Sequence, residues 1–339
     1  MNFIIFIKKT ILCLQSLFLF CTFVAEARSA ADPGSSGVQS LRSSLSYVAA
    51  VIKKKSQVNP KEIAIRNKIE QKILRTEWSR KIFERITQVQ KEYLSEMLRN
   101  IQDTQLIHNR TQETLKQISE ILNSSIVEGK ELLDAVQKEV PVMVVTNHFG
   151  AYKLTGINPL LDLGVSIEGY DFIYPYPMYF AAISPIAQIL NKNLYYVSED
   201  FPLVFGEIHT KAGFIHVPSA IDGRNQGGRT VIIEQQIKDA MVQHPNFVIV
   251  NFPEGGTSGK YSGLGPYDLD QFKTGGYVVA SHLGMIVIPV AQYFDKDEGY
   301  KLKVFAPYIP PVTSKEMYEE YANRDRLAIQ SWLDQRKDF

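Results

Sequence analysis

The stretch Val140-Pro-Val-Met-Val-Val-Thr-Asn-His-Phe-Gly-Ala-Tyr-Lys153 decides how the chain is interpreted. The residues before Asn147 form an apolar run rich in valine, which predicts a strand buried on both faces. The run ends at Asn147 and His148, so the predicted strand delivers a histidine at its carboxyl end. Open α/β sheets usually place ligands and chemistry at that end of their strands. His148 is therefore the first candidate for a functional residue.

A second junction of the same kind lies farther along the chain. The stretch Phe247-Val-Ile-Val-Asn-Phe-Pro-Glu-Gly-Gly-Thr-Ser258 also begins with a continuous apolar run. It ends in proline, glutamate and glycine, which predicts a strand followed by a loop. Glu254 is the one acidic residue of this stretch, and it becomes the second candidate.

Together, these stretches resemble the glycerolipid acyltransferases of the lysophosphatidic acid acyltransferase type. The resemblance rests first on Asn147-His148 and on the tetrapeptide Phe252-Pro-Glu-Gly255. Two further segments stand in the order of the family: Ile221-Asp-Gly-Arg-Asn-Gln-Gly-Gly-Arg229, and Phe272-Lys-Thr-Gly275 followed by Val287-Ile-Pro-Val-Ala291. The likeness covers roughly Val140 to Pro310. Phe-Pro-Glu-Gly with Phe-Lys-x-Gly downstream is fairly specific, whereas Asn-His alone would carry no weight.

The resemblance implies an acyltransferase-type αβα domain around a mixed, mostly parallel sheet. It also implies that His148 is the base that takes a proton from a substrate hydroxyl while this hydroxyl attacks an acyl carbonyl. A neutral imidazole has a suitable basicity for this step. Glu254 would help to position the acceptor, so both residues are assigned to the catalytic site. Standing alone, His148 could instead cap a strand end, and Glu254 could cap a helix or form a salt bridge.

The same resemblance implies a set of substrate contacts. Loop amides around Gly255 and Gly256 would meet the negative charge on the tetrahedral intermediate. A phosphorylated acceptor would be met by basic side chains, although each basic residue taken alone could be a surface charge. The implied substrate-binding residues are Asn147, Arg224, Arg229, Phe252, Pro253, Gly255, Gly256 and Lys273.

Two departures from the family pattern weaken a direct transfer of its chemistry. The family has His-x4-Asp, but here the matching residue is Lys153. A cation at about 4 Å would oppose protonation of the imidazole by about 1 to 4 kcal/mol. After Gly255 the chain continues Gly256-Thr257-Ser258, without the arginine that the family usually has there. The chain also resembles, more faintly, the lipid A acyltransferases with their His-x4-Glu block. The carboxylate of that block is likewise missing from this chain, which has Lys153 at the position.

Composition bounds the remaining functions. With 339 residues and 45% hydrophobic side chains, the chain can bury a full core. The 37 basic and 36 acidic residues leave a net charge of +1, which gives nucleic-acid binding no electrostatic support. The six histidines show no metal-ligand spacing, and no Gly-x-Ser-x-Gly elbow occurs. We expect no metal and no tightly bound cofactor.

The N-terminus resembles a targeting segment. Residues 1–27 carry Lys8-Lys9, an apolar run from Ile11 to Val24, and then Ala25-Glu-Ala27. This order predicts a secretory signal peptide and export to the periplasm or the secretory route. The alternative is an uncleaved membrane anchor that keeps the domain on the cytoplasmic face, where acyl-CoA and acyl carrier protein are found. Cleavage would remove both cysteines, Cys13 and Cys21.

The rest of the chain divides by composition and periodicity. Residues 28–59 are rich in Ser, Ala and Gly and predict a linker, although Lys53-Lys-Lys55 could contact anionic lipid. Residues 60–137 predict a helical region with a polar break near Asp103 to Arg110. Its apolar positions are Ile82, Ile86, Val89, Tyr93 and Met97, then Leu115, Ile118, Ile121 and Leu122. These helices either pack internally or form a platform on a bilayer.

Residues 138–311 alternate apolar runs with helical segments, which predicts an α/β domain. Residues 312–339 predict a C-terminal helix. The expected strands are Val140 to Thr146, Gly213 to Val217, Phe247 to Asn251, Met285 to Ala291 and Lys301 to Phe305, and the expected helices are Arg229 to Val242 and Ser314 to Leu333. The aromatic-rich segment Tyr170 to Phe205 is either packed in the core or part of an acyl-chain pocket or membrane-facing edge.

The sequence therefore predicts a membrane-associated acyltransferase of phospholipid biosynthesis. It would move a fatty acyl group from acyl-CoA, acyl carrier protein or a phospholipid to a lysophospholipid or related glycerolipid hydroxyl. Membrane lipid and the acyl donor are the expected partners. The alternative is an inactive relative that binds lipid, which Lys153 and the secretory signal favour.

Overall fold

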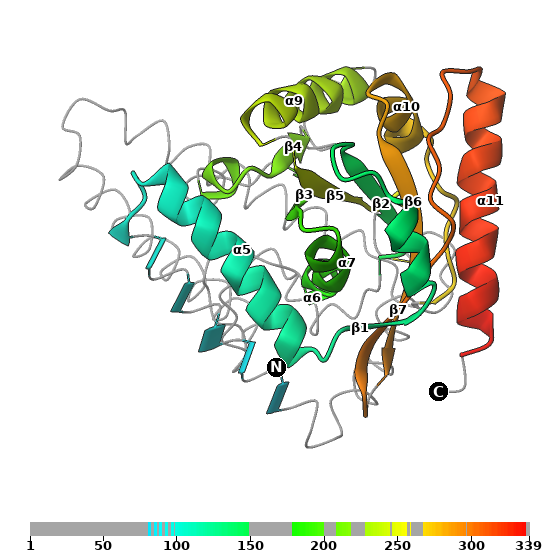
Figure 1. The fold of residues 1–339 in the computed structure, drawn as a ribbon. Coiled ribbons are helices and arrows are strands. Elements are labelled where there is room, and N and C mark those ends of the chain that lie inside the picture. The colour runs from blue at the N-terminus through cyan, green and yellow to red at the C-terminus, as the bar shows by residue number, and fades with distance from the viewer. Residues whose placement is uncertain are drawn as a thin grey trace, which may run out of the picture.

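The structure is a computed structural model, and it describes the chain in several ranges. These are individual positions between 81 and 99, followed by residues 100–148, 178–199, 208–217, 228–244, 246–255, 258, 267–295 and 297–336. The described elements form three layers, with one sheet between two groups of helices (Figure 1). This is the α/β architecture that the alternation of apolar runs and helical segments predicts.

The central layer is a seven-stranded sheet with the order β1-β7-β6-β2-β5-β3-β4. Its strands are β1 (Ser125–Glu128), β2 (Val142–Thr146), β3 (Asn193–Glu199), β4 (Ile215–Val217), β5 (Phe247–Asn251), β6 (Ile286–Asp295) and β7 (Gly299–Val304). Every pair is parallel except the hairpin of β6 and β7. The sheet is therefore mixed and mostly parallel, as expected.

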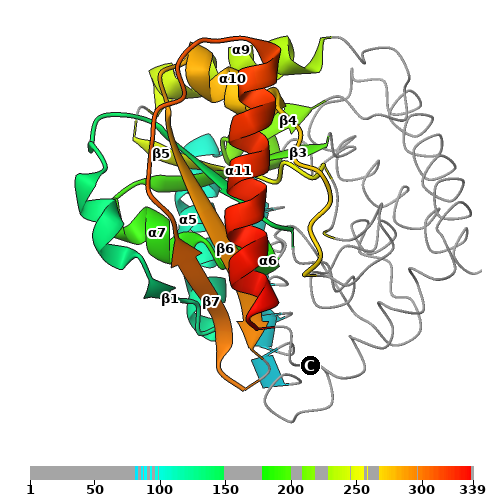
Figure 2. The ribbon, with the colours of Figure 1, turned by 90° about the vertical axis from the view of Figure 1, so that its right-hand side faces the viewer.

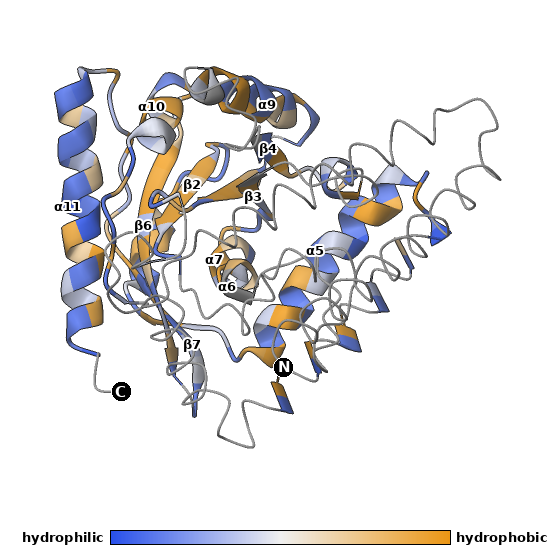
Figure 3. Cartoon of the chain, turned by 180° about the vertical axis from the view of Figure 1, so that it is seen from behind, coloured by the Kyte–Doolittle hydropathy of each residue, from blue (hydrophilic) through white to orange (hydrophobic). Residues whose placement is uncertain are grey.

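The central strands are apolar because helices cover both of their faces. All five residues of β2 are buried, and so are the first four of β5. Each fully buried valine or isoleucine contributes about 1.5 to 3 kcal/mol relative to an exposed one. Figure 3 shows β2 and β6 as hydrophobic ribbons inside the fold. Continuous apolar runs, not alternating ones, are the expected signature of such strands.

Two groups of helices cover the sheet. On one face lie α9 (Arg229–Gln243), α10 (Gly275–His282) and α11 (Lys315–Asp334), which contact one another or the strands β4 and β6. On the other face lie α5 (Thr104–Ile121), α6 (Met178–Ala181) and α7 (Ser184–Ile189), next to β3 and β1. The short 3-10 helix η1 (Lys130–Ala135) joins β1 to β2.

Polar side chains cap the N-termini of the two longest described helices, α5 and α11. The Asp103 side chain accepts a hydrogen bond from the Leu106 N–H (2.9 Å) and caps α5. Ser314 caps α11 in the same way through Met317. The predicted polar break between Asp103 and Arg110 is wrong for most of its length, because the helix resumes directly after the Asp103 cap.

The predicted boundary at residue 138 is not where the sheet begins. Strand β1 lies inside the region expected to be helical and pairs in parallel with β7. The carboxylate of Glu128 also ties this edge to α11, since it accepts hydrogen bonds from Trp332 Nε1 (2.6 Å), Arg336 (2.7 Å) and Lys303 (2.8 Å). Figure 2 shows α11 lying along the hairpin strands, so the C-terminal helix is an integral part of the α/β layer structure.

The described helical positions between 81 and 99 present one apolar face to the core. Ile82, Ile86, Val89, Tyr93 and Met97 are all buried in the same cluster as the sheet. The Tyr93 hydroxyl also lies 2.9 Å from Thr111 Oγ1 of α5. This face packs internally, so it is not a surface for docking on a bilayer.

The described part of the aromatic-rich segment Tyr170 to Phe205 is also core. It supplies α6, α7 and β3, and its buried rings include Phe180, Tyr195 and Tyr196. The expected signal peptide or anchor (1–27) and linker (28–59) lie outside the described residues. Within the described residues, no helix combines the length and apolar character that a membrane span requires.

Candidate functional site

Sheet topology brings the two loop junctions together. Strands β2 and β5 are parallel neighbours, and Val145 pairs with Asn251 at their carboxyl ends. The residues that follow, Asn147-His148 and Phe252 to Gly255, therefore leave the sheet side by side. This is the edge at which open α/β sheets usually hold ligands.

Among the described residues, main-chain hydrogen bonds and an aromatic contact join His148 to the loop that follows β5. Its N–H donates to Glu254 Oε1 (3.2 Å), and its carbonyl accepts from the N–H of Ser258 (2.9 Å). Its imidazole meets the ring of Phe252 edge-on, with ring centroids 4.8 Å apart and planes at 63°. The side chain is buried, with 8% of its surface exposed. The loop after β5 therefore contacts both the main chain and the imidazole ring of His148.

The carboxylate of Glu254 accepts hydrogen bonds from both loops. Besides the His148 N–H, its carboxylate accepts the hydroxyl of Ser258 (2.6 Å) and the N–H of Asp270 (2.8 Å). Burial raises the pKa of Glu254 to about 7, against the opposing effect of these three donors. Its contact with His148 is to the main chain of that residue. The carboxylate therefore connects the two loops, and its part in positioning an acceptor stays a prediction.

The Asn147 side chain is hydrogen-bonded to strand β6 through Gln292. Its side-chain Nδ2 donates to the carbonyl of Gln292 (3.0 Å), and its Oδ1 accepts from the N–H of Gln292 (2.8 Å). Gln292 Nε2 donates back to the Asn147 carbonyl (2.5 Å). The three bonds join β2 and β6 beyond the last paired residues, Thr146 and Val290, and both Asn147 and Gln292 are fully buried. The predicted role of Asn147 in substrate binding stays a prediction, and the structure shows its side chain bonded to Gln292.

Gly255 and Lys273 lie against each other. Gly255 has a left-handed backbone with φ 68°, and an added Cβ there would overlap Lys273 Nζ. The Lys273 N–H donates to the carbonyl of Pro253 (2.8 Å), which fixes the lysine to this loop. The Gly255 N–H donates to Phe252 O (3.0 Å) within the turn, and the role of the amides around Gly255 and Gly256 as oxyanion donors stays a prediction. The ammonium group of Lys273 therefore lies next to this loop.

Replacing Gly255 with alanine is expected to lower the free energy of unfolding by about 1 kcal/mol, because a residue with a Cβ is strained in the left-handed region. The variant should also displace the Lys273 side chain. Urea denaturation measures the first effect. Gly228→Ala is the control, because Gly228 has φ −102° and no atom within 4 Å of an added Cβ. Equal losses in both variants would contradict this account of Gly255.

Of the other two predicted basic residues, Arg224 and Arg229, the structure describes only Arg229. Arg229 is the first residue of α9, beside Thr230, whose Oγ1 would lie 3.6 Å from a Cβ added at Gly275. The amino end of α9 thus lies next to the start of α10, two residues after Lys273. Arg224, Gly256 and Lys153 lie outside the described residues.

Three residues of the site were missed from the sequence. Ser258 and Asp270 complete the set of donors around Glu254, and Gln292 holds Asn147. Gln292 had a signal, since it is a lone polar residue at the end of the apolar run Val287 to Ala291. Ser258 and Asp270 had none, because their contacts depend on how two loops fold over each other.

No family model matches the sequence, and no curated protein matches it significantly. Among the described residues, no group of three or more His, Cys, Asp or Glu side chains is arranged to hold a metal ion. The function is therefore argued from the geometry of the two loops and from the sequence resemblance.

Proposed function

We propose that this protein is a membrane-associated acyltransferase that moves a fatty acyl group to the hydroxyl of a lysophospholipid or related glycerolipid. One observation supports this most: His148, Glu254 and Lys273, which the sequence resemblance singles out from separate blocks, converge at the carboxyl ends of β2 and β5. The α/β fold is of the kind that the resemblance implies. We further propose that this α/β fold is an acyltransferase-type αβα domain.

In the proposed reaction, the neutral imidazole of His148 accepts the proton of the acceptor hydroxyl. The hydroxyl oxygen then forms a bond to the acyl carbonyl carbon, and the tetrahedral intermediate expels the thiolate of a thioester or the alkoxide of a phospholipid. The imidazolium returns its proton to that leaving group. Acyl-CoA, acyl carrier protein and phospholipid are the candidate donors, and no tightly bound cofactor is needed.

The ammonium of Lys273 supports a phosphorylated acceptor. It lies over Gly255, at the loop that also carries the ring against His148. A phosphate there would gain a charge-assisted hydrogen bond. Arg224 and Arg229 are proposed as further phosphate partners, because α9 starts beside the segment that carries Lys273.

A catalytically silent lipid-binding protein is the second candidate. Two observations favour it: Lys153 stands where the family has an aspartate, and Glu254 bonds to the main chain of His148. If Glu254 is committed to the loops, His148 needs another carboxylate to stabilise its protonated form. This candidate predicts lipid that co-purifies without turnover.

An acyl-transfer assay separates the two. The full chain and its Lys153→Asp variant are given lysophosphatidic acid with either acyl-CoA or a phospholipid as donor. The acyltransferase proposal expects turnover in the wild type, and the preferred donor then indicates which side of the membrane the domain occupies. Turnover only in Lys153→Asp would mean that catalysis was lost at this one position. Silence of both proteins towards both donors would contradict the proposal.

A further inference from the structure

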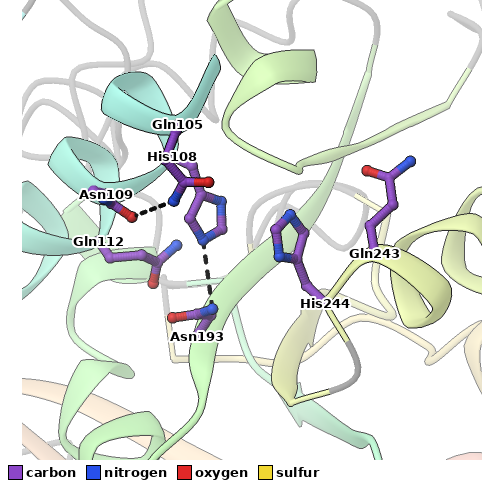
Figure 4. Close-up of a pocket in the computed structure, with 7 residues that line it drawn as sticks. All are labelled: Gln105, His108, Asn109, Gln112, Asn193, Gln243 and His244. Atoms are coloured by element: carbon purple, nitrogen blue, oxygen red, sulfur yellow. Dashed lines mark hydrogen bonds between the residues drawn. The ribbon is translucent and has the colours of Figure 1, made fainter. Parts of the chain in front are cut away.

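A polar pocket of about 520 Å³ lies at the other end of β5 from His148. It opens between α5 and the segments that lead into β3 and β5 (Figure 4). Among the described residues, its lining consists only of carboxamide and imidazole side chains, without an acidic residue, a lysine or an arginine. These side chains are Gln105, His108, Asn109, Gln112, Asn193, Gln243 and His244.

Two imidazoles face each other in this pocket. His108 of α5 and His244, which follows α9, are stacked with ring centroids 4.5 Å apart and planes at 10° (Figure 4). His108 is buried, with 6% of its surface exposed, and burial lowers its pKa, with a smaller contribution from His244. A parallel pair cannot share a metal ion, because a ligating nitrogen binds in the plane of its ring and these planes do not converge.

The described groups packed around His108 offer no compensating negative charge. From β3 come the Asn193 amide (3.4 Å from Nε2) and the Tyr195 hydroxyl (3.4 Å from Nδ1). The Ala212 carbonyl favours the protonated ring and so opposes the lowering of the His108 pKa. From the end of α9 come Gln243 and His244. Protonation of His108 would thus place a cation against the second imidazole ring, with only neutral dipoles among these neighbours.

We propose that this pocket binds a small oxyanion, a free phosphate or the phosphate of a monoester, against the stacked pair His108 and His244. The anion supplies the negative charge that the lining lacks, and the imidazolium and carboxamide N–H groups donate hydrogen bonds to its oxygens. Some of the carboxamides are already engaged: Gln112 bonds to the main chain of Leu194, and Gln105 to Asn109. Gln243, the Asn109 Nδ2 group and a reoriented Asn193 remain as donors to the ligand. The pocket is larger than one phosphate, which leaves room for an esterified polyol.

The affinity of this pocket for an anion is expected to depend on pH. Because burial lowers the pKa of His108, an anion that binds to the imidazolium form takes up a proton when it binds. The apparent dissociation constant should therefore rise about tenfold for each pH unit above the pKa of His108, per proton taken up. Binding should be strongest in mildly acidic solution and weak at pH 8.

Imidazole NMR of the full chain, labelled at histidine, tests this proposal with inorganic phosphate, with glycerol 3-phosphate and with chloride at equal ionic strength. Phosphate is expected to shift the His108 and His244 signals saturably at pH 6 and to raise the pKa of His108. Chloride should produce neither effect. Tighter binding of glycerol 3-phosphate than of phosphate would identify a phosphate ester as the preferred source, and equal binding would identify the free ion.

His244→Gln is the main variant, because His244 is only partly buried, and it should abolish the saturable shift of His108. His282→Gln is the matched control, since His282 is exposed on α10 and pairs with Glu234 (3.0 Å). The proposal is overturned if phosphate leaves the His108 and His244 signals unchanged at pH 6. It is also overturned if chloride reproduces the shifts, or if His244→Gln still gives the full response of His108.

Discussion

Replacing His148 with glutamine is expected to lower kcat/KM for acyl transfer by about 10²- to 10⁴-fold, which is the usual contribution of a general base. Glutamine keeps much of the size of the imidazole, and its main chain can keep the bonds to Glu254 and Ser258. The loss should therefore arise from chemistry, with little change in the free energy of unfolding. Steady-state acyl transfer and urea denaturation of the same preparation measure the two quantities.

His282→Gln provides the control for this prediction. His282 lies on α10 with 40% of its side chain exposed, away from the ends of β2 and β5. Its variant should keep wild-type kcat/KM. An unchanged kcat/KM in His148→Gln would exclude this histidine as the base, even if acyl transfer itself were observed.

The free energy of unfolding should fall by about 3 kcal/mol through Glu254 as the pH rises from about 4.5 to above 7. The pKa of this carboxyl group is raised from 4.5 to about 7 by burial in the folded protein. Between these values the folded state binds more protons than the unfolded state, so stability decreases with rising pH. The contribution is fully present below pH 4.5 and is lost as the pH passes the folded pKa. Its size follows because a tenfold difference in proton affinity between the two states corresponds to about 1.4 kcal/mol.

Comparison with Glu254→Gln isolates this effect, because glutamine does not titrate. The variant should be less stable at low pH, since one of its two oxygen acceptors is replaced by an NH₂ group that faces a donor. The difference in unfolding free energy between wild type and variant should then shrink as the pH rises. Other titrating groups, among them His108, contribute to both curves and cancel. Glu298→Gln, at a side chain that is 70% exposed, controls for the loss of one negative charge. A pH-independent difference would contradict the assignment of a raised pKa to Glu254.

These two experiments also divide the roles of the two loops. If His148→Gln removes turnover and Glu254→Gln mainly changes stability, the histidine is the reacting group and the glutamate is the scaffold. If Glu254→Gln also shifts the pH dependence of kcat/KM, the carboxylate affects the imidazole through the main chain that it holds. Lys153→Asp addresses the remaining question of which charge stands near the histidine.

Much of the fold could be predicted from the sequence, because its central strands are continuous apolar runs. The runs ending at Thr146 and Asn251 became β2 and β5, and the helix signals at Arg229 and Ser314 marked the starts of α9 and α11. Strands β1 and β3 were missed. The first has only four residues at the sheet edge, and the second lies in a segment of mixed aromatic and polar residues without a clear period.

The sequence by itself determined which residues are candidates for chemistry: a histidine after one buried strand, and Phe-Pro-Glu-Gly after another. Only the tertiary structure decided how they are used. The register of β2 against β5 and β6 brought Asn147 to Gln292 and Glu254 to the main chain of His148. The fold of the loop after β5 brought Lys273 to Gly255. The packing of α5 next to the end of α9 stacked His108 on His244. Such contacts join segments that are distant in the chain, so they depend on strand order and on the packing of helices over the sheet, which no local pattern encodes.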